Sequence, residues 1–330
     1  MLIYLYILSV IVITYYLYKR IFTLREGILF TSSYFLDKYK KDDILIDREN
    51  ITLERYGKKI NYKNINNISD HRFINNKSLT NNLLYKNSIP VSNSYTWDNS
   101  LSTKENLQFT NSLQFPLVVK PIKGEQGYGV TTDITCNAEL LQHINNLKNQ
   151  NKEVLIEEQA KGKEYRIMVL NDSIIGITMK TPPSVTGDGE NTINQLITNY
   201  NNKKAKDYKI HKIDYNYIKT QGYDRNDILP QGEKIIITNV ANMHNGSVVN
   251  YVDINTVNPV NIDLFKKINN VLGLKLSGID YICEDLTIPY YLDGCVIEVN
   301  SNPGLDIHYA VYPENKREEL LDTVIHNVFI

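Results

Sequence analysis

The sequence predicts an α+β protein, in which helices and antiparallel strands alternate along the chain. Short apolar runs bounded by turn residues predict strands, and apolar residues at helical spacing between some of them predict helices. These segments do not follow a regular βαβ rhythm, which argues against a doubly wound parallel sheet. With 330 residues, of which 42% are hydrophobic, the chain can bury a large core in one big domain or two lobes.

Residues 1–18 carry no charged side chain, and Lys19 and Arg20 follow them directly. As a helix this segment is about 27 Å long, close to the ~30 Å hydrocarbon core of a bilayer. The charges follow the apolar run and no small-residue cleavage site comes after it, so we favour an uncleaved anchor over a signal peptide. The alternative is a buried N-terminal helix. The positive charges predict a single-pass membrane anchor at residues 1–20, with residues 21–330 in the cytosol.

Charge balance and cysteine content narrow the class of protein. The chain has 36 Lys and Arg residues, 37 Asp and Glu residues, and a formal net charge of −1. This balance excludes a basic protein that binds nucleic acid by neutralising phosphates. Cys136, Cys283 and Cys295 are too scattered for a disulfide framework or a four-ligand zinc site, and they indicate a reducing compartment.

The remaining elements are predicted in chain order. Residues 21–75 give few strong signals, but 43–61 alternate apolar and polar residues, which predicts a small β-meander. Leu79, Leu83 and Leu84 share a helical spacing that Pro90 ends, so a helix is predicted over 78–86. Further helices are predicted over 137–149, 192–200 and 263–272. Strands are predicted over 115–120, 153–157, 164–170, 173–179, 277–282 and 295–299, and a loop rich in Pro and Gly over 181–190.

A lysine at the end of a strand is followed by a glycine-rich loop. The strand delivers Lys120, and Gly124, Gly127 and Gly129 follow Pro121. Glycines allow backbone N–H groups to close over phosphates. The loop lacks the Gly-Lys-Ser/Thr of a Walker A motif, and its spacing differs from a dinucleotide-binding fingerprint. An ordinary hairpin is the alternative explanation.

Two further groups of residues suggest chemistry. A strand that ends in Glu157, Glu158 and Gln159 could bind an adenine through its backbone and a ribose through a nearby carboxylate, although a charged turn would look the same. Asp280, Glu298 and Asn300 offer hard oxygen ligands at the ends of predicted neighbouring strands, a set that suits Mg²⁺ bound together with phosphates. Surface charges are the usual alternative, but the apolar neighbours of these three residues argue against full exposure.

Taken in order, these motifs resemble the ATP-grasp ligases. Besides the groups above, the resemblance rests on Val185–Gly189 with its Val-Thr-Gly-Asp-Gly sequence, and on the Glu-Val-Asn-Ser-Asn-Pro-Gly run that ends at Gly304. It covers roughly residues 73–310 and is greatest to the ATP-grasp domain of cyanophycin synthetase and of bifunctional glutathione synthetase. The resemblance implies an ATP-grasp fold, with two α+β lobes that grip ATP, preceded here by the transmembrane helix.

The resemblance also implies roles for individual residues. It assigns the phosphates of ATP to Lys77 and Lys120, and a mobile covering loop to Gly124, Gly127 and Gly129. It assigns the adenine to Glu157, Glu158 and Gln159, the ribose to Glu164, and Mg²⁺ to Asp280, Glu298 and Asn300. Catalytic contacts are expected from Lys120, Arg166, Lys180 and Gly304. The implied cofactors are ATP and two Mg²⁺ ions, with Mn²⁺ as an alternative.

The implied activity is an ATP-dependent carboxylate–amine ligase that works through an acyl phosphate on an amino acid or short peptide. An ATP-grasp phosphotransferase and a catalytically silent nucleotide-binding scaffold are the alternatives. The expected domains are the anchor at 1–20, a small β-rich segment at 21–75, and an ATP-grasp domain at 76–330 with lobes at about 77–155 and 156–330. Small carboxylate and amine substrates are the expected partners, without nucleic acid, and the oligomeric state is left open. Residues 238–247 depart from the relatives, because the expected basic pair is missing.

Overall fold

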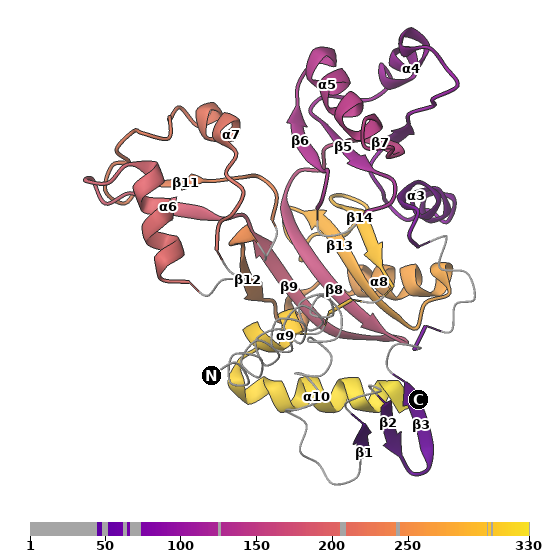
Figure 1. Cartoon of the computed structure of the whole chain (residues 1–330). Helices are drawn as coiled ribbons and strands as arrows, with labels where there is room; N and C mark the ends of the chain where they lie inside the picture. Colours follow the sequence, from indigo (N-terminus) through magenta and orange to yellow (C-terminus); the bar gives the residue numbers. More distant parts are fainter. Residues whose placement is uncertain are drawn as a thin grey trace, which may run out of the picture. The chain divides into compact units, whose positions relative to one another are not determined.

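The computed structural model describes residues 45–47, 52–61, 65–66, 74–124, 127–204, 209–241, 245–301, 303–304 and 306–329. The chain divides into two compact units (Figure 1). One unit is Met1–Ile65 with Asn302–Ile330, and the other is Asn66–Ser301. The predicted domain boundaries at residues 20 and 75 stay predictions.

The first unit contains the predicted β-meander. Strands β1 (Leu45–Asp47), β2 (Thr52–Arg55) and β3 (Lys58–Asn61) form an antiparallel sheet in that order. Helix α9 (Asp306–Val311) and helix α10 (Glu314–Phe329) also lie in this unit. Lys58 Nζ donates to the carbonyl of Phe329 at 2.7 Å, so the meander is tied to the last turn of α10.

A five-stranded antiparallel sheet forms the centre of the second unit, with the order β12-β9-β8-β13-β14. Its strands are β8 (Lys163–Leu170), β9 (Ser173–Thr181), β12 (Val248–Tyr251), β13 (Leu276–Cys283) and β14 (Cys295–Asn300). The predicted strands 164–170, 173–179, 277–282 and 295–299 are therefore confirmed. Side chains alternate between the two faces of each strand, so one face packs into the apolar core, and the opposite face carries charged residues among apolar ones such as Met168 and Leu276.

Helix α8 (Pro259–Leu272) covers the apolar face of this sheet. Pro259 occupies the first helical turn after the cap Asn258, and Gly273 ends the helix in a left-handed conformation, so the sequence defines both ends. Leu264, Phe265 and Ile268 of α8 are buried against alternate residues of the strands. The strand residues that pack there include Tyr165, Ile167, Val169, Ile177, Ile279 and Tyr281.

A second sheet, with the order β4-β7-β5-β6, lies in the same unit and carries the glycine loop. Its strands are β4 (Ser94–Thr96), β5 (Leu117–Pro121), β6 (Thr131–Ile134) and β7 (Val154–Glu158). Helix α5 (Asn137–Lys148) packs on it through Leu140, Ile144 and Leu147, and α4 (Thr103–Thr110) and α3 (Lys77–Lys86) lie nearby. The helices predicted over 78–86 and 137–149 are confirmed.

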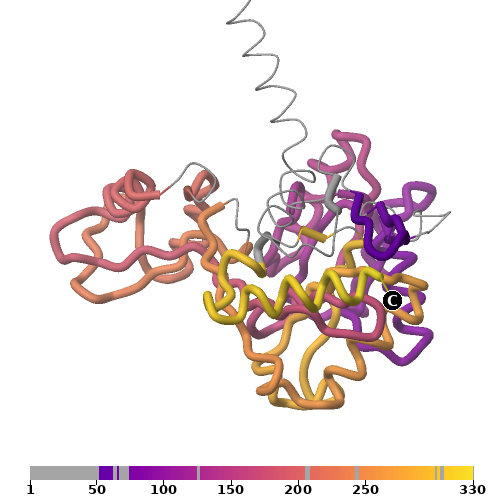
Figure 2. Tube along the Cα trace, turned by 90° about the horizontal axis from the view of Figure 1, so that it is seen from below, coloured from indigo at the N-terminus to yellow at the C-terminus, as the bar shows by residue number. Residues whose placement is uncertain are grey.

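Between β9 and β12 the chain forms a separate substructure, residues 182–247, which we call the insert. It contains β10 (Ser184–Thr186), α6 (Ile193–Asn202), α7 (Tyr215–Thr220) and β11 (Lys234–Ile236) around its own core, which includes Val185, Ile193, Ile218, Leu229 and Ile235. Figures 1 and 2 both show it extending to one side of the five-stranded sheet. The prediction of a loop over 181–190 is wrong in part, because β10 pairs antiparallel with β11, more than forty residues later in the sequence.

Residues 1–20, where the anchor is predicted, lie outside the described residues. Across the described ranges, no helix combines the length and the apolar character needed to cross a membrane. Strands β4, β6, β10, β11 and β12 and helices α4, α7, α9 and α10 were not predicted from the sequence.

Candidate functional site

Polar side chains gather on the face of the five-stranded sheet opposite α8. Antiparallel register places Arg166 opposite Asp280, and Asp280 opposite Glu298. Residues directly opposite each other have Cβ atoms about 5 Å apart on the same face. The antiparallel register of β8 with β9 places Glu164 opposite Lys180. Four strands, β8, β9, β13 and β14, therefore bring charged residues that are far apart in the sequence onto one patch.

Asp280 lies at the centre of this patch and is 4% exposed. Its Oδ1 atom is 2.8 Å from Arg166 Nε and 2.9 Å from Lys180 Nζ. Its Oδ2 atom accepts a hydrogen bond from Asn300 Nδ2 at 3.3 Å. Lys180 also pairs with Glu164. Two cations and two carboxylates therefore neutralise one another in a largely buried cluster.

Burial and neighbouring charges act in opposite directions on these groups. Burial alone would raise the pKa of Asp280, but the charges of Arg166 and Lys180 hold its pKa below the ordinary value. Burial would lower the pKa of Lys180, yet Asp280 and Glu164 raise it overall. The pKa of Glu164 is raised, mainly because burial outweighs the charge of Lys180. Asp280 and Lys180 are thus held in their charged forms.

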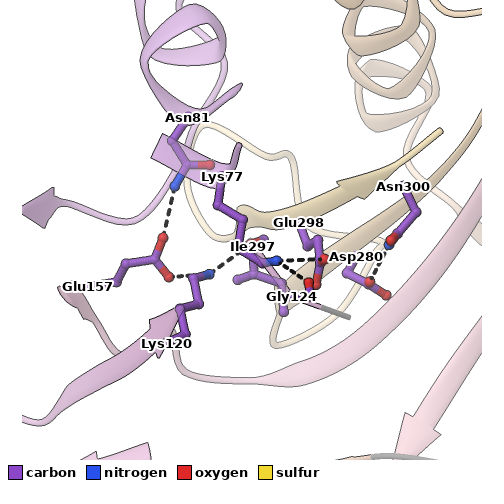
Figure 3. A network of polar contacts seen from close by, with 9 residues as sticks. All are labelled: Lys77, Asn81, Lys120, Gly124, Glu157, Asp280, Ile297, Glu298 and Asn300. Carbon is purple, nitrogen blue, oxygen red and sulfur yellow. Dashed lines mark hydrogen bonds and ion pairs between the residues drawn. The ribbon is translucent and has the colours of Figure 1, made fainter. Parts of the chain in front are cut away.

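A bulge in β14 connects this patch to the second sheet (Figure 3). The register between β13 and β14 shifts next to Asp280, where β14 holds one extra residue, Ile297. The carbonyl of Ile297 accepts a hydrogen bond from Lys120 Nζ at 3.1 Å. The bulge therefore provides a backbone acceptor for the lysine at the end of β5.

Lys120 and Glu157 form a buried ion pair. Their side-chain atoms Nζ and Oε2 are 2.5 Å apart, and the two residues are 6% and 3% exposed. Asn81 Nδ2 donates to the other carboxylate oxygen of Glu157 at 2.8 Å. Sequence reasoning missed Asn81, although it lies four residues after Lys77 on α3 and so shares a helix face with it.

Lys77 stands at the first turn of α3, after the cap Asn76. Its Nζ atom is 3.2 Å from Glu298 Oε1 and donates to the carbonyl of Gly124 at 2.7 Å (Figure 3). Gly127 and Gly129 have φ angles of 68° and 73°, which glycine adopts without strain. Lys77 therefore contacts both the glycine loop and the side-chain carboxylate of Glu298 in β14.

The side chains of the predicted adenine segment are occupied by other contacts. Glu158 accepts from Asn93 Nδ2 at 2.8 Å and from the backbone N–H of Gln114 at 2.9 Å. The Gln159 amide pairs with Asp133. Glu157 is paired with Lys120, and the backbone N–H groups of Glu158 and Gln159 donate to the carbonyls of Asn93 and Pro116.

The structure brings most predicted site residues together. The shared site contains Lys77, Lys120, Gly124, Glu157, Glu164, Arg166, Lys180, Asp280, Glu298 and Asn300. Gly304 belongs to the other compact unit, so its predicted role stays a prediction. Asp133 was not singled out from the sequence.

The predicted Mg²⁺ set is compatible with the donors present. Asp280 and Glu298 face each other across β13 and β14, and Asn300 lies two residues beyond Glu298 on the same face. Within the described ranges, no three His, Cys, Asp or Glu side chains group closely enough to hold a metal ion. The third ligand would therefore be the Asn300 amide oxygen, a hard donor of the type that Mg²⁺ prefers.

Comparison with known proteins finds a family model and curated relatives that match part of this chain. Residues 74–201 match the family model of the RimK-like ATP-grasp domain. Cyanophycin synthetase from Geminocystis herdmanii is 29% identical over 209 residues, which cover 59% of this chain and 24% of that protein. The bifunctional glutathione biosynthesis protein from Streptococcus agalactiae is also 29% identical over 209 residues, which cover 58% of this chain and 28% of that protein. The chain thus spans about a quarter of the length of these relatives.

Solved structures show the same fold. The bifunctional glutathione synthetase from Pasteurella multocida has a TM-score of 0.56 at 21% identity, with 87% of this chain and 42% of that chain covered. D-alanine–D-alanine ligase from Bacillus anthracis has a TM-score of 0.50 at 16% identity, with 78% and 68% covered. The fold is the α+β fold of ATP-grasp proteins. The chain carries a RimK-like ATP-grasp domain and is homologous to cyanophycin synthetase and bifunctional glutathione synthetase.

Proposed function

We propose that the chain is an ATP-dependent carboxylate–amine ligase that forms an amide or peptide bond through an acyl-phosphate intermediate. One observation carries this proposal: Lys77, Lys120, Arg166 and Lys180 converge on one site, and each pairs with a carboxylate there. A polyphosphate could replace these carboxylates as the partner of the cations. The relatives named above supply the class of reaction.

The proposed reaction has two steps. An oxygen of the substrate carboxylate attacks the γ-phosphorus of ATP, the bond from that phosphorus to the bridging oxygen breaks, and ADP leaves. The amine nitrogen then attacks the acyl carbon, the carbon–oxygen bond to phosphate breaks, and the amine loses a proton to the departing phosphate or to solvent. No side chain acts as a nucleophile, so catalysis depends on position and charge.

The chain's own residues have distinct tasks in this scheme. Lys77 and Lys120 bind phosphate oxygens, and Lys77 also holds the glycine loop through the Gly124 carbonyl. Arg166 and Lys180 stabilise charge that develops on the transferred group. Asp280, Glu298 and Asn300 would hold Mg²⁺, which neutralises phosphate charge when it is bound.

Hydroxylamine trapping tests the proposal. The full chain is incubated with Mg-ATP and pooled amino acids and dipeptides, and ADP and hydroxamate are measured beside Glu298→Gln. ADP with hydroxamate, both lost in the variant, supports a ligase, because only an acyl phosphate yields a hydroxamate. ADP without hydroxamate favours a phosphotransferase. ATP binding without ADP from any pool favours the silent scaffold.

We further propose that residues 1–18 anchor the chain in a membrane with the ATP-grasp domain in the cytosol. The support is the charge-free apolar run followed by Lys19 and Arg20. Cys136 is exposed, Cys295 is half-buried and Cys283 is buried, so a membrane-impermeant maleimide reports mainly on Cys136. The full chain should stay in the membrane fraction after an alkaline wash. In intact cells, the maleimide should label it only after permeabilisation. A chain without residues 2–18 that remains in the membrane fraction would contradict the anchor.

A further inference from the structure

Asp133 in β6 occupies an unusual backbone conformation. Its φ angle is 59°, a left-handed conformation that few residues other than glycine adopt and that Asp and Asn tolerate best. The pairs Leu117–Ile134 and Val119–Thr131 show that β6 holds one residue more than β5 in this stretch. Asp133 therefore lies in a β-bulge, a feature that redirects a side chain and often occurs beside active sites.

The bulge directs Asp133 toward the predicted adenine segment. Its Oδ1 atom accepts from Gln159 Nε2 at 2.8 Å, and its backbone N–H donates to Gln159 Oε1 at 2.6 Å. The Gln159 amide is thus held by two hydrogen bonds to one residue. The backbone N–H of Gln159 also donates to the carbonyl of Pro116 at 3.0 Å. Together these contacts fix the position of the backbone just after β7.

The other carboxylate oxygen of Asp133 connects to the insert. Oδ2 accepts from Thr132 Oγ1 at 2.8 Å and from Asn239 Nδ2 at 2.9 Å. Asn239 lies between β11 and β12, in the stretch 238–247 where a basic pair is expected from the resemblance and none is present. A single carboxylate therefore joins the hairpin of the glycine loop, the adenine segment and the insert.

We propose that Asp133 is a positioning residue for the nucleotide, acting through Gln159 and Asn239. The inference rests on the proposed ATP site, whose base-binding backbone Asp133 would hold in place. Ordering this segment before the nucleotide arrives removes part of the entropic cost of binding. Loss of Asp133 therefore weakens ATP binding more than it slows a saturated reaction.

Four variants of the full chain test this role. Asp133→Gly removes the side chain at a φ angle that glycine adopts freely, so the fold should persist. Asp133→Asn keeps the acceptor for Gln159, and the Asn239 amide can rotate to keep the second bond. Asn239→Ala removes one connection only. Asn171→Gly, at a φ angle of 51° in the β8–β9 turn, is the matched control.

Binding of a fluorescent ATP analogue and steady-state kinetics are measured for each variant. We expect Asp133→Gly to raise the Kd and the KM for ATP about tenfold, and Asn239→Ala to raise both about threefold. In either variant kcat should change by less than about twofold. Asp133→Asn and Asn171→Gly should stay within about twofold of the parent chain. An unchanged Kd in Asp133→Gly, or an equal loss in Asp133→Asn, overturns the role.

A second readout separates failure of this inference from failure of the proposed function. If the parent chain binds no ATP, the proposed function fails, but amide hydrogen exchange still reports on the contacts of Asp133. Exchange over residues 157–162 and 237–241 should be faster in Asp133→Gly than in the parent chain and Asn171→Gly. Equal exchange in all three overturns the inference, whatever the activity.

Discussion

Lys77 Nζ lies 3.2 Å from Glu298 Oε1, although the two residues are separated by most of the chain. The lysine comes from the first turn of α3, and the carboxylate from β14. Lys77 also donates to the carbonyl of Gly124, so one ammonium group contacts the glycine loop and the predicted metal ligand (Figure 3). Loss of Lys77 should therefore affect both the position of the glycine loop and the charge around Glu298.

Replacing Lys77 by Met should weaken ATP binding about tenfold, because one charge-assisted contact to phosphate is lost. Lys86→Met is the matched control, since Lys86 is exposed in the last turn of the same helix. Binding of a fluorescent ATP analogue measures both variants. Equal Kd values for the two variants would argue against a phosphate contact by Lys77.

The Lys120–Glu157 pair predicts a separation of stability from activity. Lys120→Met leaves the Glu157 carboxylate buried without its cation and should lower the free energy of unfolding by about 3 kcal/mol. Adding Glu157→Gln should recover most of that loss, because the Asn81 bond can form to the new amide oxygen. Neither the single nor the double variant should release ADP, because both lack Lys120. Urea unfolding and the ADP assay together check this, and an active double variant would exclude a role for Lys120 in catalysis.

Asp280 predicts a loss of stability in acid. Its pKa is lower in the folded chain than its ordinary value of 3.8, because Arg166 and Lys180 outweigh the effect of burial. Its contribution is therefore complete above that value and is lost as pH falls through the lower, folded-state pKa. The difference in free energy of unfolding between the parent chain and Asp280→Asn should be constant from about pH 7 to pH 5 and should narrow toward pH 3. Urea unfolding across this range measures it, and a difference that grows in acid would contradict the sign.

Two glycines with positive φ angles predict different costs of substitution. Gly162 has a φ of 123° and Gly222 a φ of 87°, so alanine is strained at both. A Cβ atom on Gly162 would lie 2.4 Å from the carbonyl carbon of Cys283, whereas one on Gly222 would meet nothing within 4 Å. Gly222→Ala should cost about 1–2 kcal/mol, and Gly162→Ala about 2 kcal/mol more. Thermal or urea unfolding compares them, and equal losses would mean that the backbone near Cys283 yields without cost.

The sequence predicts the large sheet well because its strands have a simple pattern. In β8 and β13, Arg166 and Asp280 each lie between two apolar residues, and the structure puts those apolar residues in the core with α8 and the two charged residues in the site. The order of the motifs likewise identifies the ATP-grasp fold. Both signals are present in the linear sequence, so they can be recognised without knowing which strands pair.

Other features depend on pairing, which a local pattern does not contain. The pairing of β10 with β11 joins residues separated by most of the insert, and the Pro- and Gly-rich stretch gives no sign of it. The bulges at Ile297 and Asp133 arise from a mismatch between two strands, so neither strand alone predicts them. Glu157 was predicted from its place at the end of a strand, but its burial with Lys120 depends on the neighbouring strand β5.

The insert leaves the five-stranded sheet after β9 and returns as β12, which pairs with β9 from Thr181 opposite Val248 onward. Its two ends therefore meet at one edge of the sheet, and its core is its own. A segment with adjacent ends and an independent core can change in length or be exchanged by recombination while the register of the sheet is kept. The topology thus leaves a route by which this scaffold could acquire new insert sequences over evolution, and by which chimeric proteins could be built in the laboratory.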